Sequence, residues 1–196
     1  MRSAAAQKWA AAFNRHMKIQ FKLQTPEEGK QFFDRDMQRD FPADEIKPWF
    51  VIEEMMKQGI YELLGAWCGD VQVGYAWMFV PAGEAVLLDY LAVLPEHRGN
   101  GVGTAILQAL HQRYPDKLLI LESEYPEDAP EPDVARRRLG FYHRVGMVNT
   151  GVEVILFGVH FCILTYGEDP KAREHMESLY HAMFPDQRYE QAVQFL

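Results

Sequence analysis

The amino-acid sequence predicts a single domain of mixed α/β class, in which helices cover a mixed sheet. Apolar residues alternate along the chain between strand-like and helix-like spacing, which predicts both kinds of element. No repeat, low-complexity tract or Gly/Ser-rich linker divides the chain, and 196 residues with 48% hydrophobic content can bury one core. We therefore expect one domain over 1–196, with helical extensions at both ends, over 1–16 and 167–196.

The first elements follow from local signals. Residues 19–23 place apolar side chains at every second position, which predicts a strand. Thr25, Pro26 and Glu27 then supply an N-cap, a first-turn proline and an acidic first turn, so a helix should begin there. A second helical stretch is expected over 41–57, because its apolar residues recur at helical spacing and should form a wide buried face.

From Tyr61 onward the apolar spacing is mostly that of strands. Gly69 and Asp70 suit a tight hairpin turn between the first two of them. Strands are expected over 61–68, 71–80, 85–94 and 117–124, with two more within 152–166 that join near Gly158. Helices are expected over 104–114, 134–145 and 169–183.

The composition excludes several classes of function. The chain has 28 acidic and 20 basic side chains, and its formal net charge of −8 would repel a nucleic-acid backbone. Its longest apolar stretch, 152–166, is too short and too polar to cross a bilayer. Cys68 and Cys162 are far apart and lack metal-ligand spacing, so we expect core thiols, a reducing cytoplasmic location and no metal.

The most informative segment is a glycine-rich turn between a predicted strand and a predicted helix. Glycines let the backbone expose consecutive N–H groups, and the start of the helix adds partial positive charge. Such a turn can hold a diphosphate with little help from charged side chains. The segment consists of Arg98, Gly99, Asn100, Gly101, Val102, Gly103 and Thr104.

Two familiar phosphate-binding motifs fit this turn less well. A Walker A motif is excluded because no Lys-Ser/Thr pair follows the glycines. A dinucleotide-binding fingerprint would need Gly or Ala at Ile106, although Glu122 lies near the position of its ribose-binding acid. Dinucleotide binding therefore stays open as a weaker alternative.

A third motif matches the turn and its surroundings. Residues 98–103 resemble the Gln/Arg-x-x-Gly-x-Gly/Ala loop of the GNAT superfamily of acyl-CoA-dependent N-acyltransferases. The segment 91–96 resembles the end of that family's central strand, and 137–147 resembles its Phe-Tyr-x-x-x-Gly-Phe helix end, with Met147 in place of the usual Phe. The motifs occur in the family's order, so the resemblance covers roughly 61–166 and implies the GNAT fold.

The resemblance also implies a cofactor site. In this family two central strands, here ending near Val93 and Glu122, splay apart and acetyl-CoA lies in the gap. Its pyrophosphate would rest on backbone N–H groups of 98–104, and its pantetheine arm would pair with the backbone of Leu91 and Val93. The backbone N–H of Val93 would meet the oxyanion, and Tyr142 matches the tyrosine that protonates the departing thiolate.

The acceptor amine must lose a proton before it attacks, because an alkylammonium has a pKa of about 10.4. By strand alternation Asp89 shares a face with the cofactor-binding strand positions and could receive this proton. The family often places a base two residues earlier, where this chain has Leu87. Glu122 and Glu124 share a face of the neighbouring strand, and Glu122 could serve as base or as an anchor for a cationic substrate.

We therefore expect a cytoplasmic N-acetyltransferase that moves acetyl from acetyl-CoA to a primary amine by direct attack in a ternary complex. The carboxylates and the negative net charge favour a cationic acceptor, either a small molecule or a peptide amine. Neither a nucleic acid nor a membrane is an expected partner, and the chain could act as a monomer or a homodimer. A non-catalytic acyl-CoA-binding sensor, which Leu87 permits, is the alternative.

Overall fold

The computed structural model describes residues 17–43 and 45–196, so the helix expected within 1–16 lies outside the described residues. The described residues divide into two compact units: 17–78 with Tyr90–Gln112, and Phe79–Asp89 with Arg113–Leu196. Strand β4 (Ala85–Val93) contributes its first residues to the second unit and its last four to the first. None of the described helices is long and apolar enough to cross a membrane.

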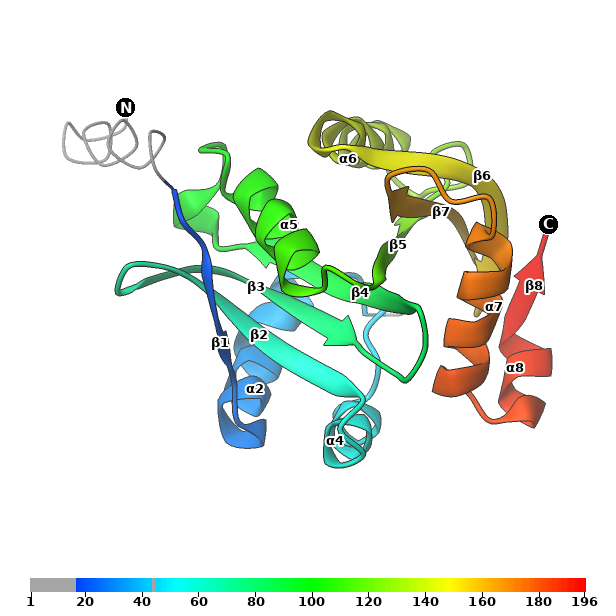
Figure 1. The fold of residues 1–196 in the computed structure, drawn as a ribbon, viewed down its shortest axis with the longest axis horizontal. Coiled ribbons are helices and arrows are strands. Elements are labelled where there is room, and N and C mark those ends of the chain that lie inside the picture. Colours follow the sequence, from blue (N-terminus) through cyan, green and yellow to red (C-terminus); the bar gives the residue numbers. More distant parts are fainter. Residues whose placement is uncertain (1–16, 44) are drawn as a thin grey trace. The chain divides into compact units, whose positions relative to one another are not determined.

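In the first unit the strands are neighbours in the order β1-β2-β3-β4 (Figure 1). β1 (Gln20–Leu23) pairs antiparallel with β2 (Tyr61–Cys68). β2 is joined to β3 (Val71–Phe79) by the predicted turn, where Gly69 has a left-handed φ of 60°. The strands expected in this part of the chain are therefore confirmed to within about a residue at each end.

Helix α2 (Pro26–Phe32) begins where the sequence predicts. The Thr25 hydroxyl accepts from the Glu28 N–H at 3.2 Å, and the Glu28 carboxylate accepts from the Thr25 N–H at 2.9 Å, which completes a capping box. The chain continues as a π-helical segment η1 (Phe33–Met37) and a short α3 (Gln38–Asp40).

The helix expected over 41–57 is shorter than predicted. α4 spans only Trp49–Lys57, because Pro48 cannot donate a helical hydrogen bond and pushes the residue before it toward extended backbone. Its buried face is also narrower than predicted. Ile52 and Met55 are buried, but the Phe50 side chain is 71% exposed.

Two close contacts hold helices against the sheet of the first unit. α2 packs against β2 at Gly29, where an added Cβ would lie 2.1 Å from the Leu63 side chain. The helix α5 (Val102–Arg113) packs against β3 at Gly74, where an added Cβ would lie 2.9 Å from Ile106 and 2.5 Å from the Ala92 carbonyl oxygen. Gly74 therefore permits the close approach of β3, α5 and the end of β4.

In the second unit the strand order is β4-β5-β7-β6-β8. β5 (Leu118–Glu124) runs parallel to β4, whereas β7 (Val159–Tyr166), β6 (Met147–Leu156) and β8 (Val193–Phe195) pair antiparallel with their neighbours. Helix α6 (Pro132–Val145) ends at Gly146, whose φ of 98° is the left-handed conformation typical of a helix C-cap.

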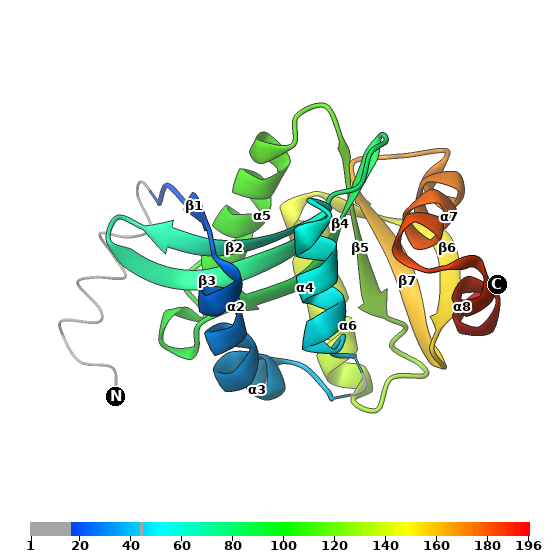
Figure 2. The same ribbon diagram turned by 90° about the horizontal axis from the view of Figure 1, so that it is seen from below.

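The C-terminal segment contains more than the predicted helix. Besides α7 (Ala172–Met183), it forms α8 (Asp186–Ala192) and the edge strand β8. Figure 2 shows α7 and α8 beside β6 and β7. The two additions were missed because seven polar-rich residues and a three-residue strand are too short to carry a periodic signal. Their position comes from pairing, since β8 aligns Phe195 with Val154 of β6.

Candidate active site

The glycine-rich turn has the backbone geometry of an anion site. A short 3₁₀ helix η2 (Pro95–His97) leads into it, and α5 follows directly. Gly99 and Gly101 have left-handed φ values of 76° and 78°, which side-chain-bearing residues rarely adopt, and both are exposed. The first turn of α5 presents N–H groups that have no acceptor within the helix. The turn can therefore receive a phosphate group.

The side chain of Arg98 is held within the first unit. Its Nε donates to the Val93 carbonyl at 2.9 Å, and its Nη2 donates to the Asp40 carboxylate at 2.7 Å. Arg98 thus fixes the start of the turn to the end of β4. Because Asp40 balances its charge, the backbone of the turn contributes more to anion binding than this guanidinium does.

Asp40 is the centre of a network that the sequence did not reveal. Its carboxylate is 2% exposed and also accepts hydrogen bonds from Arg39 at 2.8 Å and from the buried Tyr75 hydroxyl at 3.0 Å. Burial acts to raise the pKa of Asp40, but the hydrogen bonds and positive charges outweigh it and lower this pKa below its ordinary value. Burial, with the charge of Asp40, raises the pKa of Tyr75.

The end of β4 shows the alternation that the sequence predicts. Leu88 and Ala92 are buried, whereas Asp89, Leu91 and Val93 are only half-buried and occupy the other face. Tyr90, also on the buried face, donates through its hydroxyl to the Glu45 carbonyl at 2.9 Å and accepts from the Lys47 N–H at 2.8 Å. Position 87, where the resemblance would place a base, holds a fully buried leucine.

Asp89 and Glu122 lie just beyond the end of a paired segment in the second unit. β4 and β5 pair in parallel from Ala85 with Leu118 to Leu88 with Leu121. Asp89 and Glu122 follow this segment directly, each on a half-buried strand position. The two carboxylates are therefore placed on adjacent strands at matching positions.

Tyr180 of α7 contacts the second of these carboxylates, Glu122. Its hydroxyl donates a hydrogen bond to Glu122 Oε1. Burial raises the pKa of Tyr180 well above its ordinary value, and the negative charges of Glu122 and Asp89 add to the shift. We call Asp89, Glu122 and Tyr180 the carboxylate cluster. Tyr180 was missed because nothing in a helix pattern identifies a partner 58 residues away.

Glu124 differs from Glu122 although both lie on the same face of β5. Its carboxylate accepts from Arg138 of α6 at 2.9 Å and is 12% exposed. The negative charge of Glu124, which the sequence suggested could favour a cationic acceptor, is therefore largely compensated by Arg138. Arg138 of α6 therefore has a specific ion-pair partner in β5.

Tyr142 lies on α6 and its side chain is buried. Burial raises the pKa of its phenol, although the positive charge of Arg138 acts in the opposite direction. The hydroxyl is therefore protonated at neutral pH and has a proton to donate. Its ring packs against Phe141 at a centroid distance of 5.3 Å.

Neither cysteine has the setting of a nucleophile. Cys68 and Cys162 are both free thiols, and burial raises the pKa of each. Within 17–43 and 45–196, no group of three His, Cys, Asp or Glu side chains is arranged to hold a metal ion.

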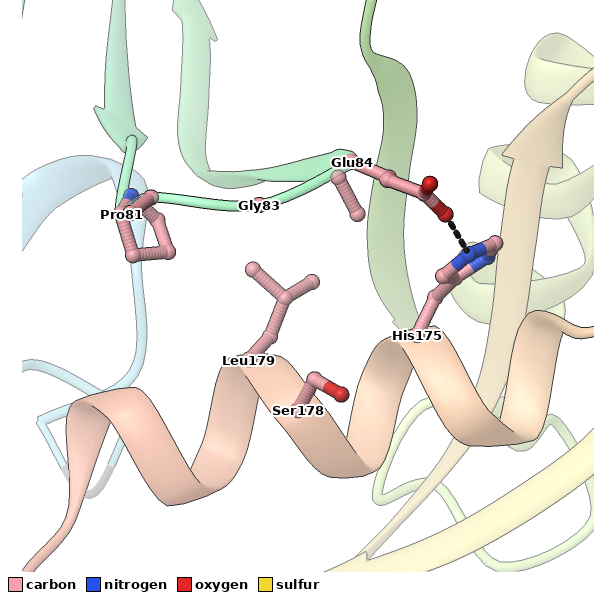
Figure 3. A pocket seen from close by; sticks show the side chains of 8 residues that line it. Pro81, Gly83, Glu84, His175, Ser178 and Leu179 are labelled. Atoms are coloured by element: carbon pink, nitrogen blue, oxygen red, sulfur yellow. Dashed lines mark hydrogen bonds and ion pairs between the residues drawn. The ribbon is translucent and has the colours of Figure 1, made fainter.

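A separate pocket of about 220 Å³ opens between the loop 81–85 and helix α7, within the second unit (Figure 3). His175 lies on its wall, with Nδ1 2.8 Å from Asp169 and Nε2 3.3 Å from Glu84. Burial acts to lower the pKa of His175, but the two carboxylates outweigh it and raise this pKa above its ordinary value. The arrangement clamps α7 to the loop when His175 is protonated.

The comparison with protein families agrees with the family resemblance of the glycine turn and of the helix end that contains Tyr142. Residues 57–147 match the family model described as the acetyltransferase (GNAT) domain. This stretch includes the turn at 98–104 and Tyr142. Residues 57–147 therefore match a GNAT acetyltransferase domain, as the motifs predict.

Solved structures share this fold at low sequence identity. A protein from Bacteroides thetaiotaomicron described as a GNAT-family acetyltransferase has a TM-score of 0.68 at 17% identity, over 83% of this chain and 94% of that one. An acetyltransferase from Bacillus subtilis, solved with CoA, has a TM-score of 0.54 at 14% identity, over 79% and 100% of the two chains. A GNAT acetyltransferase from Elizabethkingia anophelis with acetyl-CoA bound has a TM-score of 0.50 at 14% identity, over 78% of this chain and 100% of that one. None of the curated protein sequences compared with the chain matches it.

Proposed function

We propose that this protein transfers the acetyl group of acetyl-CoA to the primary amine of a small, cationic acceptor, by direct attack in a ternary complex. The observation that carries the proposal is the glycine turn, in which two left-handed glycines lead into the start of a twelve-residue helix. Acetyl-CoA would supply the activated thioester. The unpaired thiols Cys68 and Cys162 suit the reducing cytoplasm, where we place the reaction.

The cofactor side of the proposed site is made of backbone. Residues Arg98 to Thr104 would bind the pyrophosphate through their N–H groups, with the positive end of the α5 dipole behind them. The half-buried strand positions Leu91 and Val93 would pair with the pantetheine arm. We assign the N–H of Val93, which lies at the end of β4, to the oxyanion that forms during acyl transfer.

The acceptor side of the proposed site is the carboxylate cluster. Glu122, fixed by Tyr180, would anchor the positive charge of the acceptor, and Asp89 would receive the proton that the attacking ammonium must lose. Two carboxylates at matching positions of adjacent strands favour a cation over an anion. The acceptor class therefore includes polyamines, amino sugars, amino acid derivatives and peptide amines.

Tyr142 would complete the reaction. Once the amine nitrogen bonds to the thioester carbon, the tetrahedral intermediate collapses and the C–S bond breaks. The electron pair stays on sulfur, and the phenol of Tyr142 gives its proton to the departing thiolate. The second proton that the nitrogen loses on becoming an amide then returns the phenolate of Tyr142 to its neutral form. The raised pKa of Tyr142 keeps this proton available at neutral pH.

A panel of amines at fixed acetyl-CoA tests the proposal, with released CoA thiol as the signal and mass spectrometry to identify the acetylated product. We expect cationic amines to be acetylated and anionic ones to react poorly. Tyr142→Phe should lower kcat by about a hundredfold while acetyl-CoA affinity is preserved, because general acid catalysis typically contributes 10²–10⁴-fold.

Tyr114→Phe, at the end of α5, is the matched control and should behave like the wild type. Turnover confined to anionic acceptors would refute the cationic site. Acetyl-CoA binding without turnover of any amine would favour the sensor alternative instead.

A further inference from the structure

We infer that Tyr180 is a positioning residue that orients the Glu122 carboxylate toward the acceptor amine. The inference rests on the proposed function and deepens it. Tyr180 lies in α7, outside the residues 57–147 that match the family model. The C-terminal segment would then be part of the acceptor site rather than a mere addition to the fold.

The position of the Tyr180 hydroxyl is fixed by its surroundings. The side chain is fully buried, and its ring lies 6.1 Å from that of Phe184 and 6.0 Å from that of Phe195 in β8. Phe195 is itself held by the pairing of β8 with β6. The unpredicted edge strand therefore helps to hold the tyrosine ring in place.

The other partner of the hydrogen bond is fixed as well. Glu122 lies in β5 opposite Ile163 of β7, in an antiparallel ladder that runs from Ile120 to Glu124. With the backbone set by this ladder, a donor on Oε1 determines the rotation of the carboxylate and hence the direction in which Oε2 points. A carboxylate held in this way loses less rotational entropy when it binds an ammonium group.

The direction of this hydrogen bond follows from the charges around it. Tyr180 faces Glu122 and Asp89 from the strands and lies near Tyr189 of the following helix. Both carboxylates oppose a second negative charge on the phenol, so the hydroxyl stays protonated and acts as the donor. A hydrogen bond donated to a carboxylate stabilises its charged form, which is the form that binds a cation.

A purely structural role would give the same packing but not the same chemistry, and Tyr180→Phe separates the two. The variant keeps the ring and loses the hydroxyl. We expect the KM for the amine to rise about tenfold, because a hydrogen bond donated to a charged group contributes more than one between neutral groups, and because Glu122 is only half-buried. The KM for acetyl-CoA should stay within about twofold of the wild type.

The pH profile gives a second readout. Without its donor the Glu122 carboxylate is easier to protonate, so the acidic limb of kcat/KM should move to higher pH. In a Glu122→Gln background, the Tyr180→Phe change should add little, because the group that it positions is gone. Tyr189→Phe, which removes a hydroxyl from the neighbouring α8, is the matched control.

The inference is overturned if Tyr180→Phe leaves the amine KM and the acidic limb unchanged in an active enzyme, or if it has the same effect with and without Glu122. Should Tyr180→Phe fail to fold, difluorotyrosine at position 180 keeps the hydroxyl as a stronger donor. It should move the acidic limb to lower pH, and an unmoved limb would overturn the inference. A wild-type protein that acetylates no amine would instead refute the proposed function itself.

Discussion

Replacing Asp40 with alanine should destabilise the first unit by about 3 kcal/mol, a magnitude that follows from what each partner loses. The buried Tyr75 hydroxyl would have no acceptor, which costs about 1–3 kcal/mol. Arg39 and Arg98 have side chains that are 43% and 53% exposed, so water can replace much of what they lose. Each of these ion pairs contributes at most about 1 kcal/mol.

Urea unfolding at pH 7, followed by tryptophan fluorescence, measures this cost. For a chain of this size, about 3 kcal/mol corresponds to a fall in Tm of roughly 6–12 °C. Asp40→Asn should cost less, because its amide oxygen can still accept from Tyr75. Asp34→Ala breaks only the exposed pair with Lys30 and serves as the control. A loss for Asp40→Ala no larger than for Asp34→Ala would refute the reasoning.

The pH dependence of the same variant has a definite sign. Because the folded state lowers the pKa of Asp40, its contribution to stability is present above the unfolded pKa of about 3.9 and is lost as pH falls through the folded pKa. The stability difference between the wild type and Asp40→Ala should therefore shrink in acid. A difference that grows below pH 4 would contradict this assignment.

Three further perturbations test other parts of the account. Gly74→Ala should cost about 1–3 kcal/mol in urea unfolding, since the new Cβ would lie 2.5 Å from the Ala92 carbonyl oxygen, whereas Gly140→Ala, which meets only a flexible arginine, should not destabilise. Gly101→Ala should weaken acetyl-CoA binding about tenfold by calorimetry, because a left-handed φ costs other residues about 1–2 kcal/mol. An unchanged affinity would exclude the turn as the acetyl-CoA site. His175→Gln should lower Tm near pH 6 but little at pH 9. The folded state raises the pKa of His175, so its contribution to stability is present below the unfolded pKa of about 6.5 and is lost as pH rises through the folded pKa. An equal loss of Tm at both pH values would refute the role of the His175 ion pairs.

Local sequence signals predicted most of the fold. Capping residues, hairpin glycines and apolar periods act between near neighbours, so the start of α2, the turn at Gly69 and the ranges of β2 and β5 could be predicted closely. The predicted start of α4 was wrong because the effect of Pro48 on the backbone outweighed a run of apolar residues with helical spacing. The edge strand β8 could not be predicted because its three residues acquire their structure by pairing with β6.

Only part of the candidate site could be predicted from the sequence. The glycine turn is contiguous, so its geometry follows from the residues themselves. Asp40 and Tyr180 were missed because each reaches its partner, Arg98 or Glu122, across 58 residues of chain. Contacts of that kind depend on how packed elements meet, and one sequence without the fold contains no signal for them.

Thermal unfolding with and without acetyl-CoA, with NAD as the control ligand, tests the central claim that the glycine turn binds acetyl-CoA. A ligand that binds only the folded state at a hundred times its Kd adds about 2.7 kcal/mol to stability. We predict a rise in Tm of roughly 5–11 °C with acetyl-CoA and none with NAD. No shift at saturating acetyl-CoA, or an equal shift with NAD, would contradict the assignment of this turn and the function built on it.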